Sequence, residues 1–207
     1  MIPVSNPIPE PHGFEVECRR KGQAWLAANR SAKRPKDMWS PYRLALAAGF
    51  SDRCGYGAMW ISSGTVDHFV CCSEDLQRAY EWANYRYIEG WINSSKKKIP
   101  STDLLDPFEV KDGWFEIDLP SLQLKLTDAV PAQCRWRAEQ TLKRLPLRDD
   151  ERVIRQRRAW YALYQSGDLS LEGLRQKAPL IAAAVEKAGS LPYAAFKPKE
   201  TVYAASN

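Results

Sequence analysis

Apolar residues recur at helical spacing near the N-terminus and again through the last third of the chain. Residues 14–29 place apolar side chains on one face, as an amphipathic helix does. The pair Ser40–Pro41 is a helix-start signal, and the helix that it opens should end at Gly49. An extended, proline-rich arm is expected over residues 1–12. Further helices are predicted over 131–144 and 149–165, and in two shorter pieces that begin at Ser170 and Pro179.

The middle of the chain has the short alternating runs that are typical of β-strands. We predict strands over 58–62, 65–70 and 84–88, a short helix over 90–98, and a hairpin from 114–118 and 122–126. The predicted fold is therefore α+β, with a central core and a small hairpin between N-terminal and C-terminal helices. Its expected parts are an arm with helices (1–50), the core (51–110), the hairpin with C-terminal helices (111–190) and an irregular tail (191–207).

Composition narrows the class of protein. The chain has 207 residues, of which 44% are hydrophobic and 27% charged, as in a soluble globular protein. It contains no run close to the ~18 apolar residues of a membrane span, and its N-terminus does not resemble a signal peptide. Five cysteines are an odd and sparse set, which argues against a disulfide scaffold. A cytoplasmic location is expected.

Positive charge is concentrated in one segment. Residues 133–160 hold nine basic and four acidic residues, so this stretch alone matches the net charge of +5 of the whole chain. Most of the basic residues are arginines, which suit forked contacts with phosphate. We expect Arg152, Arg155 and Arg158, on one predicted helix, to contact nucleic acid. The alternative is a helix face that is merely solvated.

Histidine is rare, and this restricts where acid–base chemistry can lie. The chain has two histidines, and His12 belongs to the N-terminal arm, so a histidine base in a packed site would be His68. Asp67 precedes it, and Asn93 follows on the predicted helix. Their carboxylate and amide oxygens suit Mg²⁺ or a similar divalent ion. Because successive side chains of a strand point to opposite faces, Asp67 and His68 converge only where the strand ends or twists.

The order Asp67–His68, Asn84 and Asn93-Ser-Ser-Lys96 resembles the ββα-metal motif of HNH endonucleases, in its His-Asn-Asn variant. The resemblance covers residues 54–107. It implies that Asp67 and Asn93 bind one divalent metal ion, Mg²⁺ or else Mn²⁺, that His68 is the general base, and that Asn84 orients its ring. Lys96, one helical turn after Asn93, would contact phosphate, or else belong to a solvated group of lysines over 96–98.

Many HNH domains also hold a structural zinc with two Cys-x-x-Cys pairs, and here this chain departs from the family. The corresponding residues, which we call the four zinc positions, are Cys54, Gly57, Glu89 and Ile92. Because only one of them is cysteine, a four-cysteine zinc site is excluded. We expect packing to fill that space instead, by Tyr56, Trp60, Trp82, Trp91 and Ile92.

The resemblance implies a metal-dependent endonuclease that cuts DNA, with RNA as an alternative substrate because no residue visibly reads the sugar. Small bacterial HNH proteins that share a following Leu-Asp-Pro segment, here residues 105–107, include members of anti-phage systems that act beside an ATPase. An ATPase or regulatory partner and a role in antiviral defence are therefore expected. The main alternative is a non-catalytic subunit with an HNH-like fold that binds nucleic acid or a partner. A third is an unrelated helical interaction protein.

Overall fold

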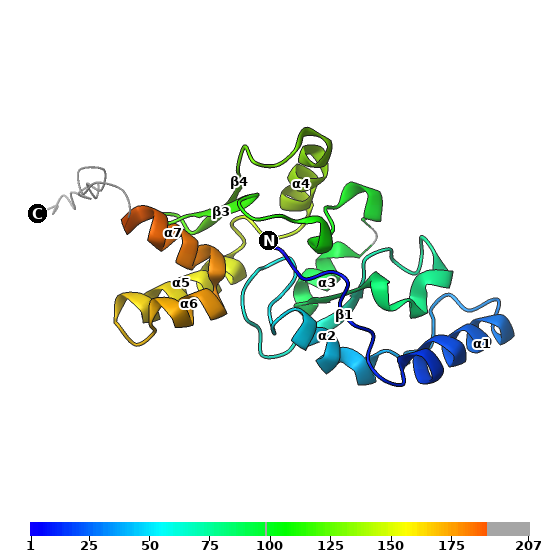
Figure 1. Cartoon of the computed structure of the whole chain (residues 1–207). Coiled ribbons are helices and arrows are strands. Elements are labelled where there is room, and N and C mark those ends of the chain that lie inside the picture. The colour runs from blue at the N-terminus through cyan, green and yellow to red at the C-terminus, as the bar shows by residue number, and fades with distance from the viewer. Residues whose placement is uncertain (98, 190–207) are drawn as a thin grey trace, which may run out of the picture.

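The computed structural model of this chain describes residues 1–97 and 99–189. Two antiparallel two-stranded hairpins lie among helices from both ends of the chain (Figure 1). This arrangement is compatible with the predicted α+β class. The irregular tail predicted over 191–207 lies outside the described residues.

The N-terminal helices form where the apolar spacing and the Ser-Pro signal predicted them. A π-helical turn over Glu15–Arg20 continues into α1 (Lys21–Ala28), and a 3₁₀ turn over Ser40–Tyr42 continues into α2 (Arg43–Gly49). Phe14 is fully buried, and its ring contacts Trp82 edge to face at 5.2 Å between centroids. The indole Nε1 of Trp82 donates to the Ile8 carbonyl at 3.0 Å. The N-terminal arm is thus packed against the central part of the chain.

The central hairpin is followed at once by a helix. Strands β1 (Thr65–His68) and β2 (Tyr85–Ile88) pair antiparallel, with His68 opposite Tyr85. Helix α3 (Gly90–Lys96) begins two residues after β2 ends. All four residues of β2 are buried, as expected for a strand that is covered on both faces. The chain therefore builds a β–β–α unit at the place where the motif residues lie.

The strand predicted over 58–62 is wrong. This segment folds into a tight loop that makes a single bridge, between Arg53 and Trp60. The amide of Ala58 donates to the Cys54 carbonyl at 2.8 Å, and the amide of Cys54 donates to the Met59 carbonyl at 2.9 Å. Ala58 also has a φ of 57°, which strand geometry does not allow. Bonds within the loop replace the ladder that a strand would have made.

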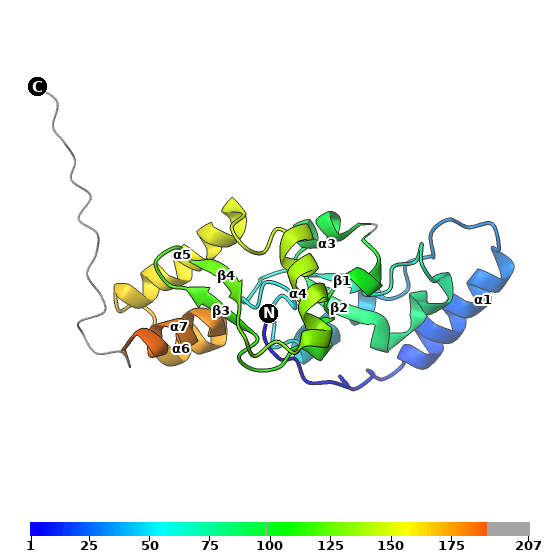
Figure 2. The ribbon, with the colours of Figure 1, turned by 90° about the horizontal axis from the view of Figure 1, so that it is seen from above.

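The C-terminal elements agree with their sequence signals. The second hairpin pairs β3 (Phe115–Asp118) with β4 (Gln123–Leu126), and the helices are α4 (Ala132–Arg144), α5 (Glu151–Gln165), α6 (Leu171–Lys177) and α7 (Pro179–Gly189). The cap of α5 is Asp150, one residue later than expected. Helices α5, α6 and α7 gather at one end of the molecule and α1 lies at the other (Figure 2). None of the helices in the described residues has the length and apolarity to cross a bilayer.

A buried arginine ties α5 to the second hairpin. Arg157 has 1% of its surface exposed, and its guanidinium donates to the carbonyls of Leu122, Leu147 and Arg148 at 2.6–2.9 Å. Burial lowers its pKa to about 10. Arg157 is therefore not exposed to solvent, whereas Arg152, Arg155 and Arg158 of the same helix are.

Candidate active site

The predicted site residues all lie on the β–β–α unit but do not face one point. Asp67 and His68 are consecutive in β1, so their side chains leave the strand on opposite faces. Asp67 faces α3, where Lys96 contacts it. His68 lies on the other face, with its ring 4.6 Å from that of Trp39 and 5.1 Å from that of Tyr85. In this structure the base and the predicted metal ligand are therefore separated by the strand.

The ring of His68 is fixed in one tautomer by the backbone. Its Nε2 lies 2.8 Å from the carbonyl oxygen of Ala79. Because a carbonyl only accepts hydrogen bonds, Nε2 must carry the proton and Nδ1 the lone pair. Nδ1 has no hydrogen-bond partner among the described residues. Burial lowers the pKa of His68, against the opposing effect of the Ala79 carbonyl, so the ring is neutral at pH 7.

Asn84 does not orient the ring of His68, contrary to the prediction. Its Oδ1 accepts a hydrogen bond from the amide of Val70 at 2.9 Å, and its Nδ2 donates to the carbonyls of Val70 (3.0 Å) and Arg78 (3.1 Å). These bonds close the loop between β1 and β2. The same loop carries Ala79, so these bonds connect the segment after β1 to the loop whose carbonyl contacts His68.

Lys96 does not reach the surface to meet phosphate, which corrects a second prediction. Its ammonium lies 2.9 and 3.0 Å from the two carboxylate oxygens of Asp67. It also donates to the carbonyls of His68 (2.7 Å) and Phe69 (2.9 Å). The side chains of Lys96 and Asp67 are 3% and 4% exposed. The turn that separates Lys96 from Asn93 brings it beneath β1, where four oxygens enclose its charge.

As placed, the predicted metal ligands Asp67 and Asn93 are engaged by other side chains. Mg²⁺ requires oxygen ligands with room for several waters, whereas both oxygens of Asp67 are held by Lys96. The amide of Asn93 is directed to Thr65, to whose Oγ1 its Nδ2 donates at 3.1 Å. Lys96 would have to leave Asp67 before that carboxylate could bind a metal ion.

The four zinc positions converge, although three of them lack cysteine. Cys54 Sγ accepts a hydrogen bond from the amide of Gly57 at 3.3 Å. A Cβ atom added to Gly57 would lie 3.5 Å from that sulfur and 4.0 Å from Cδ1 of Ile92. Burial raises the pKa of the Cys54 thiol to about 11, opposed by hydrogen bonds from the backbone of Glu89 and of Gly57. The four zinc positions are thus neighbours in the fold, with a single cysteine among them.

The five residues predicted to fill this space differ in burial, and Trp82 packs against the N-terminal arm. Tyr56, Trp82 and Ile92 are buried, with at most 6% of their surfaces exposed. Trp60 and Trp91 are only half-buried. Each carries a cation over its ring: Lys177 lies 4.0 Å from the centroid of Trp60, and Arg152 lies 4.2 Å from that of Trp91. These two tryptophans therefore connect the central unit to α6 and α5.

Introducing cysteine at the three zinc positions that lack it should create a zinc site. We expect the triple variant Gly57→Cys, Glu89→Cys, Ile92→Cys to bind one Zn²⁺ per chain together with Cys54, in tetrahedral geometry. Binding is measured by metal analysis and by the thiolate absorption bands of a Co²⁺ derivative. The same triple variant with Cys54→Ser is the control. A folded triple variant that binds no more Co²⁺ than this control would contradict the convergence of these positions.

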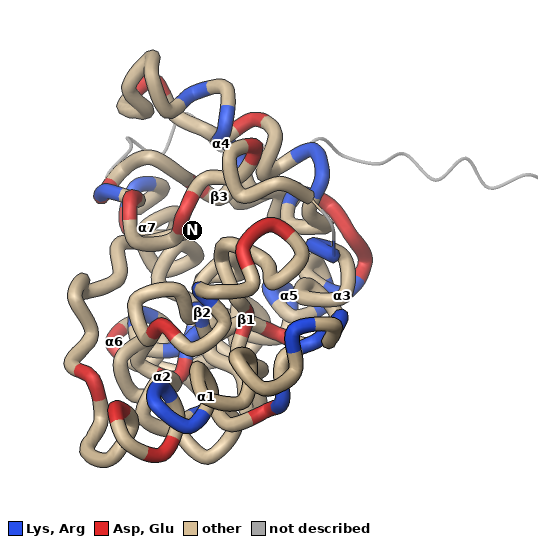
Figure 3. Tube along the Cα trace, turned by 90° about the vertical axis from the view of Figure 1, so that its right-hand side faces the viewer, with Lys and Arg blue, Asp and Glu red and all other residues tan. Residues whose placement is uncertain are grey.

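The three arginines predicted to contact nucleic acid lie on α5, and the first of them, Arg152, is next to α3. Arg152 lies over Trp91 of α3 and is bonded to Asp150 at 2.9 Å. Arg155 is 76% exposed and lies 3.9 Å from Glu151, whereas exposed Arg158 has no partner within the described residues. Arginines lie along α5, whereas α3 has a single basic residue, Lys96 at its end (Figure 3). The outer face of α5 therefore carries positive charge next to the β–β–α unit.

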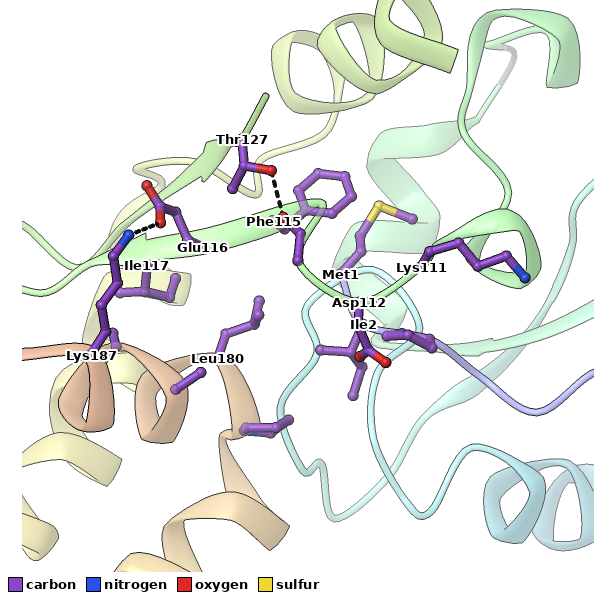
Figure 4. A pocket seen from close by; sticks show the side chains of 15 residues that line it. Met1, Ile2, Lys111, Asp112, Phe115, Glu116, Ile117, Thr127, Leu180 and Lys187 are labelled. Carbon is purple, nitrogen blue, oxygen red and sulfur yellow. Dashed lines mark hydrogen bonds and ion pairs between the residues drawn. The ribbon is translucent and has the colours of Figure 1, made fainter. Parts of the chain in front are cut away.

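An apolar cleft lies apart from this unit. It has a volume of about 310 Å³ and is formed by the first residues of the chain, β3 and α7 (Figure 4). Met1, Phe115 and Leu180 line it, and the ion pair of Lys187 with Glu116 spans 2.8 Å beside it. None of the predicted site residues contributes to its wall.

Comparison with known proteins leaves the family open, because no family model, curated protein or solved structure matches this chain. The resemblance to HNH endonucleases therefore rests on the residues and geometry of the β–β–α unit. Three observations bear on it: the order of the elements, the tautomer of His68 and the convergence of the four zinc positions.

Proposed function

We propose that this protein is an HNH-type endonuclease that hydrolyses phosphodiester bonds of DNA. The observation that carries the proposal is His68, which lies on the first strand of a β–β–α unit. Its Nε2 contacts a backbone carbonyl, and its Nδ1 has no hydrogen-bond partner in the part of the chain that the structure describes. The closeness of the four zinc positions also supports the proposal, because they are the positions that bind one zinc ion in the family pattern. In this chain they lie together although three of them lack cysteine.

In the proposed reaction, His68 acts as general base. Nδ1 takes a proton from a water molecule while the oxygen of that water forms a bond to phosphorus. The bond from phosphorus to the leaving oxygen breaks. The Nε2–H bond to the Ala79 carbonyl stabilises the imidazolium that results. The leaving oxygen takes a proton from solvent. Asn84 keeps the Ala79 loop in place through its three backbone hydrogen bonds.

The cofactor, substrate and setting of this activity rest on the resemblance alone. Mg²⁺ is the expected metal and Mn²⁺ the alternative, but the Asp67–Lys96 pair stands against either in the present arrangement. DNA rather than RNA as substrate, an ATPase partner, a role in anti-phage defence and a cytoplasmic location belong to the same proposal.

The Asp67–Lys96 pair favours a second candidate function. If the protein binds no catalytic metal, the buried pair of Asp67 and Lys96 has a structural role. In that case the protein would be a non-catalytic subunit with an HNH-like fold that binds nucleic acid or a partner. The exposed arginines of α5 would serve this role as well as they serve an enzyme.

Plasmid cleavage distinguishes the two candidates. Wild-type protein and His68→Ala are incubated with supercoiled DNA in Mg²⁺, in Mn²⁺ and in excess chelator, and DNA binding is measured in parallel. Cleavage by the wild type that is lost in the variant supports the nuclease. DNA binding without cleavage in any condition supports the non-catalytic subunit.

Neutralising the α5 arginines should weaken DNA binding. We expect Arg152→Gln, Arg155→Gln and Arg158→Gln together to lower affinity for all sequences alike, and to reduce the slope of log affinity against log salt by about three. Fluorescence anisotropy with duplex DNA at several salt concentrations measures both. A triple variant with the same loss of charge near α1, namely Arg20→Gln, Lys21→Gln and Arg30→Gln, is the control. Equal losses of DNA affinity in the two triple variants would mean that binding depends on the net charge of the protein and not on the α5 arginines.

A further inference from the structure

Arg53 holds a positive charge that no described residue neutralises. It follows α2 and is half-buried, and its Nε is enclosed without a hydrogen-bond partner. None of the carboxylates in the described residues lies within ion-pairing distance of its guanidinium. Burial alone lowers the pKa of Arg53. Because removing a charge from water without pairing it is costly, this guanidinium is suited to an anion from outside the chain.

A pocket adjoins this guanidinium and contains a second cation. Its volume is about 300 Å³, and it is lined by Ser51, Asp52, Arg53, Trp60, Gln176 and Lys177. The backbone of Trp60 bridges to Arg53 on one side, and its amide donates to the carbonyl of Lys177 at 2.8 Å on the other. These contacts fix the end of α6 against the loop after α2. Two cations from distant parts of the sequence thus share one pocket.

The lining is rich in hydrogen-bond donors and nearly free of competing acids. Arg53, Lys177 and the amide of Gln176 are donors, and Ser51 adds a hydroxyl. Asp52 is the single acid of the lining; it is exposed, and no ion pair joins it to either cation in the part of the chain that the structure describes. With Arg53 and Lys177 as its cations and Asp52 as its acid, the lining has a formal charge of +1.

We propose that this pocket binds a phosphate group, either of a free nucleotide or of a nucleic-acid backbone. The guanidinium of Arg53 would donate two parallel hydrogen bonds to phosphate oxygens, and Lys177 would add the second charge. Asp52 would weaken binding by repulsion. The pocket shares no residue with the β–β–α site, so this proposal does not depend on the nuclease activity.

Calorimetric titration with inorganic phosphate and with a 5′-mononucleotide tests the proposal on the full chain. Arg53→Gln and Lys177→Gln should each lower affinity about tenfold, the value of one charged hydrogen bond, while Asp52→Asn should raise it. Lys177 ends a helix at the surface, so Lys177→Gln keeps the test valid if Arg53→Gln fails to fold. Lys33→Gln, which removes an exposed cation outside the pocket lining, is the control and should leave phosphate binding unchanged.

A second arm identifies the source of the phosphate. If it belongs to a nucleic-acid backbone, Arg53→Gln should weaken binding of duplex DNA and lower its salt slope by about one. If it belongs to a free nucleotide, DNA binding should stay unchanged and the mononucleotide should bind more tightly than inorganic phosphate. Two results would overturn the proposal. In the first, the protein binds neither phosphate nor the nucleotide, and Arg53→Gln leaves DNA binding unchanged. In the second, the wild type and both Gln variants bind phosphate and DNA equally well.

Discussion

Replacing His68 with alanine is expected to slow DNA cleavage by about 10²–10⁴, the range for a lost general base, while DNA binding is retained. The fold should tolerate the change because the Ala79 carbonyl keeps a second donor, the hydroxyl of Tyr85 at 2.8 Å. The substitution therefore leaves no buried acceptor unpaired. Initial rates of plasmid nicking, measured at matched protein stability, give the effect. His12→Ala, which changes the other histidine, should cleave like the wild type.

The pH dependence of the same reaction provides an independent check. Burial lowers the pKa of His68 below its usual value of 6.5, and only the neutral ring can accept a proton. The rate should therefore be level at neutral pH and fall only as the pH drops through that lowered pKa. The residual rate of His68→Ala should lack this acidic limb. An unchanged limb in the variant would assign the titration to another group and remove His68 from the mechanism.

The second large effect is on stability and concerns the Asp67–Lys96 pair. Asp67→Ala should reduce the free energy of unfolding by about 3–5 kcal/mol, because it leaves the buried ammonium of Lys96 without its counter-charge. Lys96→Met should be destabilising for the converse reason. In the double variant Asp67→Leu, Lys96→Met no charge remains uncompensated, so its loss should be smaller than the sum of the single losses. Urea denaturation of the four proteins measures the coupling.

Additive losses in that cycle would mean that the pair is not formed in the folded protein. Asp67 would then be available to a metal ion, as the resemblance to HNH endonucleases implies. Strong coupling would mean that an activity loss in Asp67→Ala cannot be assigned to a metal site until the stability of the variant has been restored. Lys96→Met supplies the comparison, because it disturbs the same pair but keeps the carboxylate.

The secondary structure could be predicted where its signals are local. The 3₁₀ turn that begins at Ser40–Pro41 and leads into α2, the cap of α6 at Ser170 and the hairpin of β3 and β4 depend on residues within a few positions of one another. The predicted strand over 58–62 was wrong because Ala58 adopts a positive φ that its residue type does not signal. A loop stabilised by its own backbone bonds can carry the same apolar residues as a strand.

For the site, local order and residue rarity determined the candidates. One histidine outside the arm, the succession of motif residues and the missing cysteines could all be recognised from the chain alone. The roles of Asn84 and Lys96 could not, because their partners are Val70 and Asp67 on a strand and loop far away in the sequence. The same holds for Arg53, whose pocket exists only because α6 packs on the loop after α2. Backbone propensity acts between neighbours, whereas the partner of a buried charge is chosen by the packing of distant elements.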